Sequence, residues 1–355
     1  MMITVDEMLE CPPYSLSARE KDSSFSKIIS TTVKHHYERC VEYKRFLDLL
    51  GWRPTEVSCW EQIPPLHVRV FKETRLASVE PSAIIKTLTS SGTSGTGVSQ
   101  IFLDSETSRR QTKALAKIGS DYIGAKRLPM LVIDQPLGNK KLRHLSARGA
   151  GVTGFSMFAK NVTYALEEDM EVNWSAVGEF CKANANKQSL IFGFTFIVWK
   201  YFVKRLLASS RTFSLEQGIL IHGGGWKRLV EESVSSEDFK EAVGKATCIR
   251  RVHNYYGMVE QTGSIFLECE RGYLHVPNVA DISVVDEHFE RCAFGDSGVI
   301  KLCSLLPSSY PGHVILSDDR GYVVGEDSCR CGRLGKYFIV EGRLPRVEIR
   351  GCSDV

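Results

Sequence analysis

A run of hydroxyl residues and glycines at positions 90–95 is the part of this sequence whose chemistry is easiest to state. Glycine lets the backbone approach a bound group closely, and successive N–H groups in such a loop form a cradle for anions. An apolar run at 83–88 precedes the loop and predicts a strand, while 104–117 predicts a helix. A strand, a loop of this kind and a helix are together typical of phosphate binding. The loop residues are Ser90, Ser91, Gly92, Thr93, Ser94 and Gly95.

The loop is nevertheless a poor match to the P-loop of nucleoside triphosphatases. That motif needs a lysine as the point charge on the outer phosphates, and Val98 stands at this place. A flexible Ser/Gly linker is the alternative interpretation. We favour a phosphate loop because a linker does not normally lie between a strand pattern and a long helix pattern.

Composition limits the classes of protein to consider. The chain has 355 residues, of which 43% are hydrophobic and 25% charged, as in an ordinary globular protein that can hold more than one domain. Its net charge of +3 and the lack of a long basic run argue against nucleic acid as a partner. The most apolar segment, 190–203, is too short to span a bilayer. It predicts a buried strand that runs into a helix, and its aromatics could also line an apolar substrate pocket.

The cysteines indicate a reducing compartment. Eleven cysteines with scattered spacing, in a sequence that begins without a secretory signal pattern, predict a cytoplasmic protein without a disulfide framework. Three thiols and one imidazole match the ligand types of a tetrahedral zinc site. These candidate ligands are Cys269, His275, Cys329 and Cys331. The Cys-x-Cys spacing is tighter than usual, so free thiols are the alternative.

The hydrophobic pattern predicts four parts. Apolar residues at helical spacing over 24–50 predict one helix that ends at Gly51. From 83 to 250 short apolar runs alternate with amphipathic ones, which favours an α/β sheet core. Beyond 263 short strands alternate with turns. We expect an N-terminal helical region (1–82), an α/β nucleotide-binding core (83–262), a β-rich subdomain (263–341) and a C-terminal tail (342–355).

Four later segments add candidate residues. His222-Gly-Gly-Gly-Trp-Lys227 follows an apolar strand, and its bare backbone leaves room for a flat ring. Segment 254–261 places an aromatic residue and a carboxylate on either side of a glycine. Segment 316–322 ends a strand with acidic residues at a turn, and 342–355 carries a Gly-Arg pair and a cysteine. Each is weak alone, but their order and spacing are informative.

In this order the motifs resemble those of the adenylate-forming superfamily, which includes acyl-CoA synthetases, peptide-synthetase adenylation domains and luciferase. The resemblance covers most of the chain, from about residue 60 onward. Within the superfamily, 222–227, Tyr256-Gly-Met-Val-Glu-Gln261 and Arg350-Gly-Cys-Ser-Asp354 are similar to the acyl-protein synthetase branch of the LuxE type. The phenylacetate–CoA ligase branch is its neighbour, and relatives of that type carry cysteines similar to the candidate zinc ligands.

The resemblance implies a fold and a nucleotide site. The fold is α/β, that of the N-terminal domain of adenylate-forming enzymes, with mixed sheets, a β-rich subdomain and a C-terminal lid that is absent or vestigial. The substrates and cofactors implied are ATP and Mg²⁺. Loop 90–95 would bind the phosphates of ATP, Gly223 and Gly224 would flank the adenine, and Tyr256 would stack on it.

Three further residues receive roles from the resemblance. Asp319 would accept hydrogen bonds from the ribose hydroxyls, and Arg343 would neutralise ribose-phosphate oxygens. Glu260 would hold Mg²⁺, since a hard cation prefers carboxylate oxygen. The superfamily's loop also carries a lysine near its last glycine, where this chain has valine. The missing charge would have to come from another cation, with Lys72, Lys86 and Arg148 as the candidates.

The segment after Arg343 also departs from the superfamily, in which a mobile lid with a catalytic lysine usually follows. An enzyme that uses its own cysteine as the acyl acceptor needs such a lid less. The LuxE resemblance places that acceptor at Cys352. Arg346 and Arg350 nearby favour its thiolate, although Asp354 opposes this. The alternative is that Cys352 is simply the last cysteine of the chain.

These observations predict an ATP-dependent acyl-protein synthetase. It would activate a carboxylic acid, a fatty acid by resemblance, as the acyl adenylate, transfer the acyl group to Cys352, and pass it to a partner such as an acyl reductase. One alternative is an adenylating ligase that delivers the acyl group to CoA or to a carrier-protein thiol. A second alternative, from another class, is a non-catalytic nucleotide- or acyl-binding partner protein.

Overall fold

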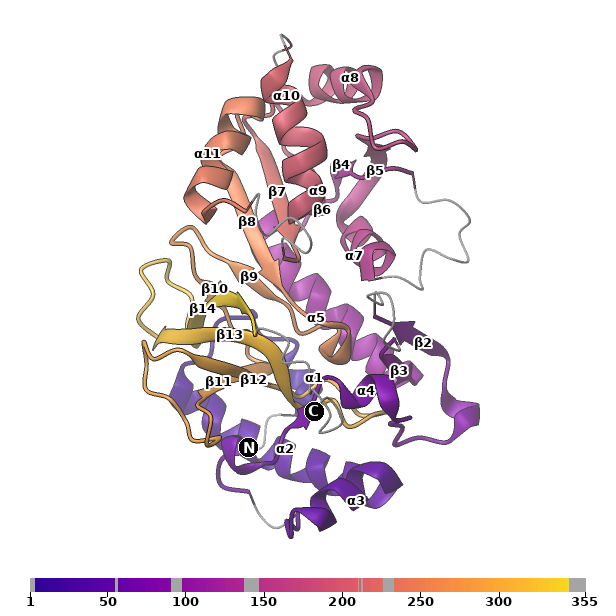
Figure 1. Cartoon of the computed structure of the whole chain (residues 1–355), viewed down its shortest axis with the longest axis vertical. Coiled ribbons are helices and arrows are strands. Elements are labelled where there is room, and N and C mark those ends of the chain that lie inside the picture. The colour runs from indigo at the N-terminus through magenta and orange to yellow at the C-terminus, as the bar shows by residue number, and fades with distance from the viewer. Residues whose placement is uncertain are drawn as a thin grey trace, which may run out of the picture.

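A single large mixed sheet organises the protein. The computed structural model describes residues 4–54, 57–90, 98–136, 147–209, 211, 213–225 and 233–344. Within them, twelve strands form one sheet in the order β11-β12-β13-β14-β10-β9-β8-β7-β6-β4-β5, with β1 added beside β13. The upper part of Figure 1 holds the parallel strands, and the lower part holds the antiparallel ones. The predicted α/β class is confirmed.

The parallel half consists of β4 (Leu128–Ile133), β5 (Ala159–Tyr164), β6 (Ser189–Phe194), β7 (Gly218–Gly223) and β8 (Arg251–Tyr256). Strands β6 and β7 are buried throughout, as expected for parallel strands with both faces covered. The helices α7 (Ala147–Phe155), α8 (Trp174–Asn184), α10 (Lys204–Ala208) and α11 (Ser236–Thr247) belong to this half. The predicted strand-to-helix segment 190–203 is confirmed, because β6 leads into α9 (Thr195–Ile197) and a π-helix (Val198–Val203).

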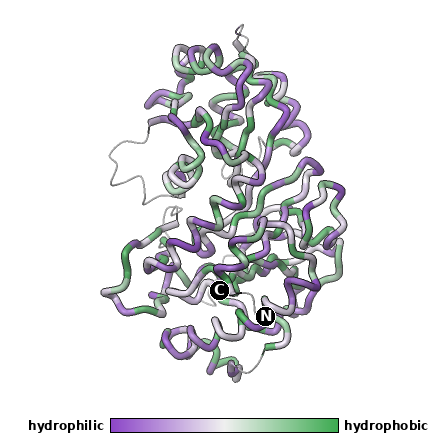
Figure 2. The backbone as a smooth tube through the Cα atoms, turned by 180° about the vertical axis from the view of Figure 1, so that it is seen from behind, coloured by the Kyte–Doolittle hydropathy of each residue, from purple (hydrophilic) through white to green (hydrophobic). Residues whose placement is uncertain are grey.

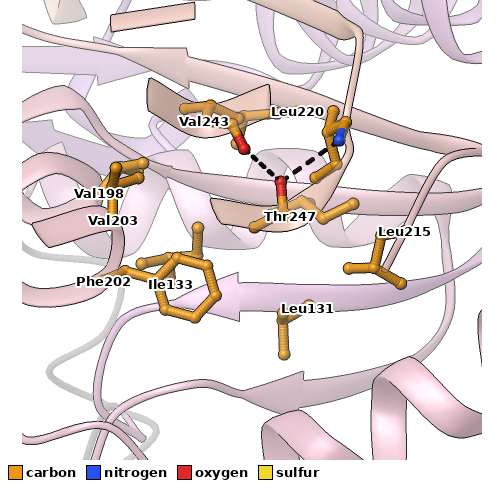
Figure 3. Close-up of a pocket in the computed structure, with 11 residues that line it drawn as sticks. Leu131, Ile133, Val198, Phe202, Val203, Leu215, Leu220, Val243 and Thr247 are labelled. Atoms are coloured by element: carbon orange, nitrogen blue, oxygen red, sulfur yellow. Dashed lines mark hydrogen bonds between the residues drawn. The ribbon is translucent and has the colours of Figure 1, made fainter. Parts of the chain in front are cut away.

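Alternation along β6 assigns the helices to the two faces of the sheet. Phe192 stacks on Phe155 of α7, with ring centroids 4.6 Å apart. Its neighbour Ile191 faces the other way, into a small apolar cavity that the π-helix and α11 close (Figure 3). This cavity is about 10 Å³, and the Thr247 hydroxyl at its edge donates to the Val243 carbonyl. An apolar cavity of this size stays dry and is too small for a ligand.

The antiparallel half begins where β8 pairs with β9, which runs in the opposite direction. Its strands are β9 (Phe266–Glu268), β10 (Leu274–His275), β11 (Ala280–Val285), β12 (Gly298–Ser304), β13 (Val314–Glu326) and β14 (Lys336–Arg343). The boundary expected at residue 263 therefore falls inside a continuous sheet. The long strand β13 lies between β12 and β14 and also pairs with β1.

The N-terminal region differs from the single helix expected over 24–50. It forms α1 (Val5–Met8), α2 (Ala18–Arg39) and α3 (Val41–Leu49). Cys40 separates α2 from α3, because its backbone is extended, with φ −113° and ψ 108°. The helical spacing of apolar residues in the sequence therefore continues across a point where the helix itself is interrupted. Beyond α3 come β1 (Leu66–His67) and α4 (Val70–Glu73). Single 3₁₀ turns occur at Trp60–Gln62, Pro81–Ala83 and Ser156–Phe158.

The segment around the predicted phosphate loop is a hairpin. Strand β2 (Lys86–Thr89) pairs antiparallel with β3 (Gln100–Leu103), and helix α5 (Ser105–Ile123) follows. Strand β3, between the loop and this helix, was not predicted from the sequence. The helix itself is confirmed, and the Asp104 side chain caps it by accepting from the Thr107 N–H at 2.8 Å.

A buried ion cluster joins the N-terminal region to the antiparallel half. Asp281 of β11 lies 3.7 Å from the Lys21 ammonium of α2 and 3.2 Å from that of Lys336 in β14. The Trp60 indole donates to the same carboxylate at 2.9 Å. Burial alone would raise the pKa of Asp281, but the two lysines and the hydrogen bonds outweigh it and hold that pKa low. Removing one partner would leave a buried charge unpaired, so the cluster favours this one arrangement of the N-terminal region against the antiparallel half.

Apolar and polar residues are distributed differently between the strands and the helices. Figure 2 shows apolar residues gathered on the strands and polar residues recurring along the helices around them. No helix in the described ranges is both long and apolar enough to cross a bilayer.

Two stacked histidines lie where α2 meets the segment before β13. The His36 and His313 rings are 4.7 Å apart and nearly parallel, and both side chains are fully buried. His36 Nδ1 lies 2.7 Å from the Ser78 hydroxyl, and the Tyr43 hydroxyl lies 3.1 Å from His313 Nε2. Burial lowers the pKa of His313 to about 3 and that of His36 well below its ordinary value, and neighbouring histidines lower both further. Both imidazoles are therefore neutral in the folded protein.

We expect this pair to make the fold sensitive to acid. The unfolded chain binds a proton near pH 6.5 and the folded chain only at lower pH, so stability is retained above pH 6.5 and falls as pH decreases toward about 3. Each histidine contributes up to about 1.4 kcal/mol per pH unit to the free energy of unfolding. Urea unfolding at pH 7, 6 and 5 should show a shallower decline for His313→Gln than for the wild type. The exposed His288→Gln is the control, and equal slopes in both variants would contradict the assignment.

Candidate functional site

Four parallel strands end at one edge of the sheet, which is where ligands bind in open α/β folds. Phe194 ends β6, Gly223 ends β7 and Tyr256 ends β8, while Asp134 follows β4. The register places Phe194 beside Gly223, and Gly223 beside Tyr255. The structure therefore brings the predicted glycines and Tyr256 to the same carboxyl edge.

The two glycines are required by their surroundings. A Cβ on Gly223 would lie 2.3 Å from Cε1 of the Tyr255 ring, which covers this position. Gly224 has φ +78°, a backbone conformation that favours glycine, and a Cβ there would lie 3.1 Å from the Phe194 ring. The missing side chains at these two positions therefore make room for the Tyr255 and Phe194 rings, which pack directly against the backbone at the end of β7.

An aromatic wall stands beside these glycines. Phe192, Phe194 and Tyr255 pack with Phe155 of α7, and the Phe155 and Tyr255 rings are 5.4 Å apart. A Cβ on Gly151 would lie 3.1 Å from the Phe194 ring, so a larger residue at this position of α7 would require a small shift of that ring. The aromatic residues of segment 190–203 next to the site are buried core residues, which agrees with the interpretation of this segment as core packing.

Tyr256, Asp319 and Arg343 form a connected group. The Tyr256 hydroxyl donates to Asp319 Oδ2 at 2.7 Å, and Arg343 Nε lies 3.6 Å from Asp319 Oδ1. The pairing of β13 with β14 sets Asp319 directly opposite Arg343. Burial raises the pKa of Tyr256, and the Asp319 carboxylate raises it further, so the phenol stays protonated and donates. The Arg343 side chain is mostly exposed and free to reach a ligand at this edge.

Glu260 lies on a single 3₁₀ turn, Val259–Gln261, and is only 6% exposed. The Tyr310 hydroxyl donates to its backbone carbonyl at 2.9 Å. Burial raises the pKa of the Glu260 carboxyl, while the Ser99 hydroxyl and then the Lys72 and Arg343 cations lower it. The site therefore holds a buried carboxylate that favours nearby positive charge.

The base of the predicted phosphate loop is closed by two serines. The Ser99 N–H donates to the Ser90 hydroxyl at 2.9 Å, and the Ser90 N–H donates to the Ser99 carbonyl at 3.2 Å. The Ser99 side chain is fully buried and faces Glu260, so the loop begins and ends beside this carboxylate. Sequence reasoning missed Ser99, since nothing in its spacing distinguishes it from the other hydroxyl residues. Ser91, Gly92, Thr93, Ser94, Gly95 and Cys352 lie outside the described residues.

A second set of residues was not expected from the sequence. Strand β1 runs parallel to β13 and pairs His67 with Leu316, which brings the turn after β1 beside Asp318. The expectation that 316–322 ends a strand at a turn is wrong, because β13 continues through these residues to Glu326. Arg69 Nη2 lies 3.0 Å and His67 Nε2 lies 3.4 Å from the Asp318 carboxylate. These contacts join residues about 250 positions apart in sequence, so they cannot be predicted from the pattern of any single segment.

The four candidate zinc ligands are brought together at the other end of the antiparallel strands. The ligand atoms of Cys269, His275, Cys329 and Cys331 all lie within 4.8 Å of one another. Cys269 Sγ is 3.9 Å from Cys329 Sγ, and Cys331 Sγ is 3.3 Å from His275 Nε2. Tetrahedral zinc with bonds of about 2.3 Å to sulfur and 2.0 Å to nitrogen places its ligand atoms roughly 3.5–3.8 Å apart. The donor set and its spacing fit such a site.

Solved structures with a similar fold include ligases. A crystal structure of 2-hydroxyisobutyryl-CoA ligase in complex with 2-HIB-AMP and CoA superposes with a TM-score of 0.69, at 15% identity, over 92% of this chain and 71% of that one. A long-chain-fatty-acid-CoA ligase of Archaeoglobus fulgidus matches with a TM-score of 0.50, at 13% identity, over 75% of this chain and 53% of that one. The fold is that of the N-terminal domain of adenylate-forming ligases.

The sequence comparison defines the family. The family model described as acyl-protein synthetase, LuxE, matches residues 2–355, and this chain therefore belongs to the LuxE family. It is also similar to the long-chain-fatty-acid–luciferin-component ligase of Vibrio harveyi. The two are 22% identical over 351 residues, which cover 96% of this chain and 89% of that protein.

The packing of Tyr255 over Gly223 gives a direct test of the carboxyl edge. Gly223→Ala should lower the free energy of unfolding by about 1–3 kcal/mol, because the added methyl group displaces a packed ring. Gly225→Ala is the matched control, since a Cβ there meets no described atom within 4 Å. Urea unfolding of both variants measures the difference. Equal stability of the two would show that Tyr255 does not cover Gly223.

Proposed function

We propose that this chain is an ATP-dependent acyl-protein synthetase that forms an acyl adenylate and transfers the acyl group to its own Cys352. The observation that carries the proposal is the arrangement of Glu260, Tyr256, Asp319 and Arg343 around one edge of the sheet. Within a chain of the LuxE family, these are the residues to which the motifs assign the nucleotide.

The nucleotide would lie along the carboxyl edge. The adenine would lie beside the Gly223-Gly224 backbone, as the motif resemblance implies, and against Tyr256, whose ring is fixed by its hydrogen bond to Asp319. The second oxygen of the Asp319 carboxylate would accept from a ribose hydroxyl, and the exposed Arg343 guanidinium would contact ribose-phosphate oxygens. Loop 90–95 and its base at Ser90 would face the phosphates.

Glu260 is the residue that fits Mg²⁺. It offers carboxylate oxygens, which hard cations prefer, and its burial favours a cation beside it. Bound there, Mg²⁺ would neutralise phosphate charge during transfer. The protein's own contribution is to hold this carboxylate in place, through the Tyr310 hydroxyl on its carbonyl and the Gln261 amide, which donates to the Gly312 carbonyl at 2.9 Å.

The reaction would proceed in two steps. A carboxylate oxygen of the acid attacks the α-phosphorus of ATP, the bond from that phosphorus to the bridging oxygen breaks, and pyrophosphate leaves. The Cys352 thiolate then attacks the acyl carbonyl, and AMP leaves, which gives a thioester. Both steps need alignment and charge neutralisation above all. The acyl group would pass from Cys352 to a partner protein such as an acyl reductase.

The acid is proposed to be a fatty acid. The motif resemblance implies this class of substrate. The name of the Vibrio harveyi relative, a long-chain-fatty-acid ligase, supports the same class.

Pyrophosphate exchange and acyl labelling test this proposal together. The wild type should exchange pyrophosphate into ATP only when a fatty acid is present and should retain labelled acyl groups through hydroxylamine-sensitive bonds. Cys352→Ser should keep the exchange and lose the thioester label, whereas Glu260→Gln should lose exchange by on the order of 100-fold.

Cys292→Ser is the control for the thiol, because Cys292 is a half-buried cysteine on the hairpin between β11 and β12. Exchange that does not depend on a carboxylic acid would refute the synthetase. Full thioester labelling of Cys352→Ser would refute Cys352 as the acceptor and indicate another cysteine of the chain. Exchange by the wild type without any label on the protein would instead indicate transfer to CoA or a carrier protein.

We also infer that Cys269, His275, Cys329 and Cys331 hold a structural Zn²⁺. The fit of the distances to a tetrahedron supports this, and so does the position of the ligands after β9, in β10 and between β13 and β14. His275 Nδ1 is buried without a partner among the described residues, while its Nε2 faces the thiols. Bound there, zinc would join three strand connections rather than take part in chemistry.

Metal analysis of the purified protein should find about one zinc per chain. Cys331→Ser should lose most of it and lower the Tm by several degrees, because 1 kcal/mol corresponds to about 2–4 °C in a chain of this size. Cys292→Ser should change neither quantity. A zinc-free wild type, or a Cys331→Ser variant with unchanged zinc and Tm, would refute the site.

A further inference from the structure

The phosphate side of the proposed site lacks the lysine that a phosphate loop usually provides, since Val98 stands there. A triphosphate brings several negative charges to this place, and Glu260 adds one more. A single Mg²⁺ and Arg343 leave part of this charge uncompensated. Three other cations were candidates from the sequence, namely Lys72, Lys86 and Arg148, and the structure separates them.

Arg148 is already used. Its guanidinium binds both oxygens of the Asp134 carboxylate, which is 1% exposed, so the two charges neutralise each other at the start of α7. Releasing Arg148 toward a phosphate would leave a buried carboxylate without a partner, which is costly.

Lys86 is badly placed. It is exposed at the first position of β2 and pairs across the hairpin with Leu103, at the end away from the loop. The loop base at Ser90 lies four residues further along, or about 13 Å of extended chain.

Lys72 lies on α4, which is anchored to the same framework as Glu260. The Val68 N–H donates to the Leu316 carbonyl at 3.0 Å, which holds the turn after β1 against β13. Phe71 is 1% exposed, and its ring meets the Tyr310 ring edge to face at 6.3 Å. Tyr310 in turn donates to the Glu260 carbonyl. Lys72 therefore follows directly after Phe71, whose ring packs against the tyrosine that holds the Glu260 turn.

The charge of Lys72 is available for a ligand. The other two basic side chains of this turn, His67 and Arg69, are paired with Asp318. The Lys72 side chain is half-buried, and within the described part of the chain its ammonium makes no hydrogen bond and no ion pair. Its field nevertheless reaches Glu260, since it lowers the pKa of that carboxyl against the larger effect of burial. A half-buried ammonium beside an anion site, without a protein partner, is suited to binding an anionic ligand.

We propose that the Lys72 ammonium binds the outer phosphates of ATP and so takes the place of the lysine that the loop lacks. This inference rests on the proposed function, because it assigns a residue to the triphosphate of that site. The chemistry is that of a lysine in a P-loop: a compact point charge on phosphate oxygens. The difference is its origin, since the charge comes from a turn that precedes the loop in sequence and packs beside Glu260.

Comparison of ATP with AMP tests the assignment. Lys72→Met should weaken ATP binding roughly 10- to 100-fold, the range for loss of one charge-assisted hydrogen bond to phosphate. AMP lacks the outer phosphates, so its affinity should stay within about twofold, well below one charged hydrogen bond. Calorimetric titration with each nucleotide in the presence of Mg²⁺ gives both constants, and the KM for ATP in the exchange assay gives an independent value.

Two further variants make the result specific. Lys86→Met removes the same charge from the exposed start of β2 and should leave both nucleotides unaffected. Introducing Val98→Lys into Lys72→Met places a lysine at the loop position. Recovery of ATP affinity in this double variant would support the proposal that Lys72 does the work of the missing loop lysine.

The inference and the proposed function fail in different ways. If the wild type binds ATP and catalyses carboxylate-dependent exchange while Lys72→Met binds ATP equally well, the inference is overturned and the function stands. Equal weakening of ATP and AMP, or a fall in Tm that accounts for the loss, would also overturn it, because Lys72 would then act on the fold. A wild type without exchange would refute the function itself.

Discussion

The burial of one carboxylate, that of Glu260, is the constraint around which this site is organised. A carboxylate that is 6% exposed favours its protonated form, and burial indeed raises its pKa. The opposing effects come first from the Ser99 hydroxyl and the backbone N–H of Glu260 itself, and then from two cations, Lys72 and Arg343, which approach from separate parts of the chain. The carboxylate is thus kept in a place where a further cation is favoured, which is the property that a magnesium ligand needs.

The fold holds Glu260 through a segment that is remote in sequence. Segment 305–313, between β12 and β13, contacts the Glu260 turn through Tyr310 and Gly312. The same segment is tied to the start of α5 through Ser309, whose N–H donates to the Thr107 hydroxyl at 3.1 Å. His36 and His313 tie it to α2. The N-terminal helices contributed little to the motif resemblance, but they pack against the segment that holds the Glu260 turn in place.

The sequence predicted those features that depend on local pattern or on short spacing. Apolar runs identified β6 and β7, and the motifs identified Gly223, Tyr256 and Glu260, which the structure brings to one edge of the sheet. Strand β3 was missed because four residues after a polar loop give no periodicity. The break at Cys40 was missed because the apolar pattern continues through it. The approach of β1 to β13 depends on pairing across about 250 residues, which no single segment encodes.

The two ends of the antiparallel strands are mechanically connected. Strand β14 begins beside the Cys/His cluster, where Tyr337 pairs with His275, and ends at Arg343 opposite Asp319. Strand β9 pairs Phe266 with Tyr256 and leads into Cys269. A metal that fixes the cluster would therefore fix the register of the strands that present Tyr256 and Arg343, because a slip of one residue turns every side chain to the opposite face. In this arrangement the proposed zinc would stabilise the geometry of the nucleotide edge without touching a substrate.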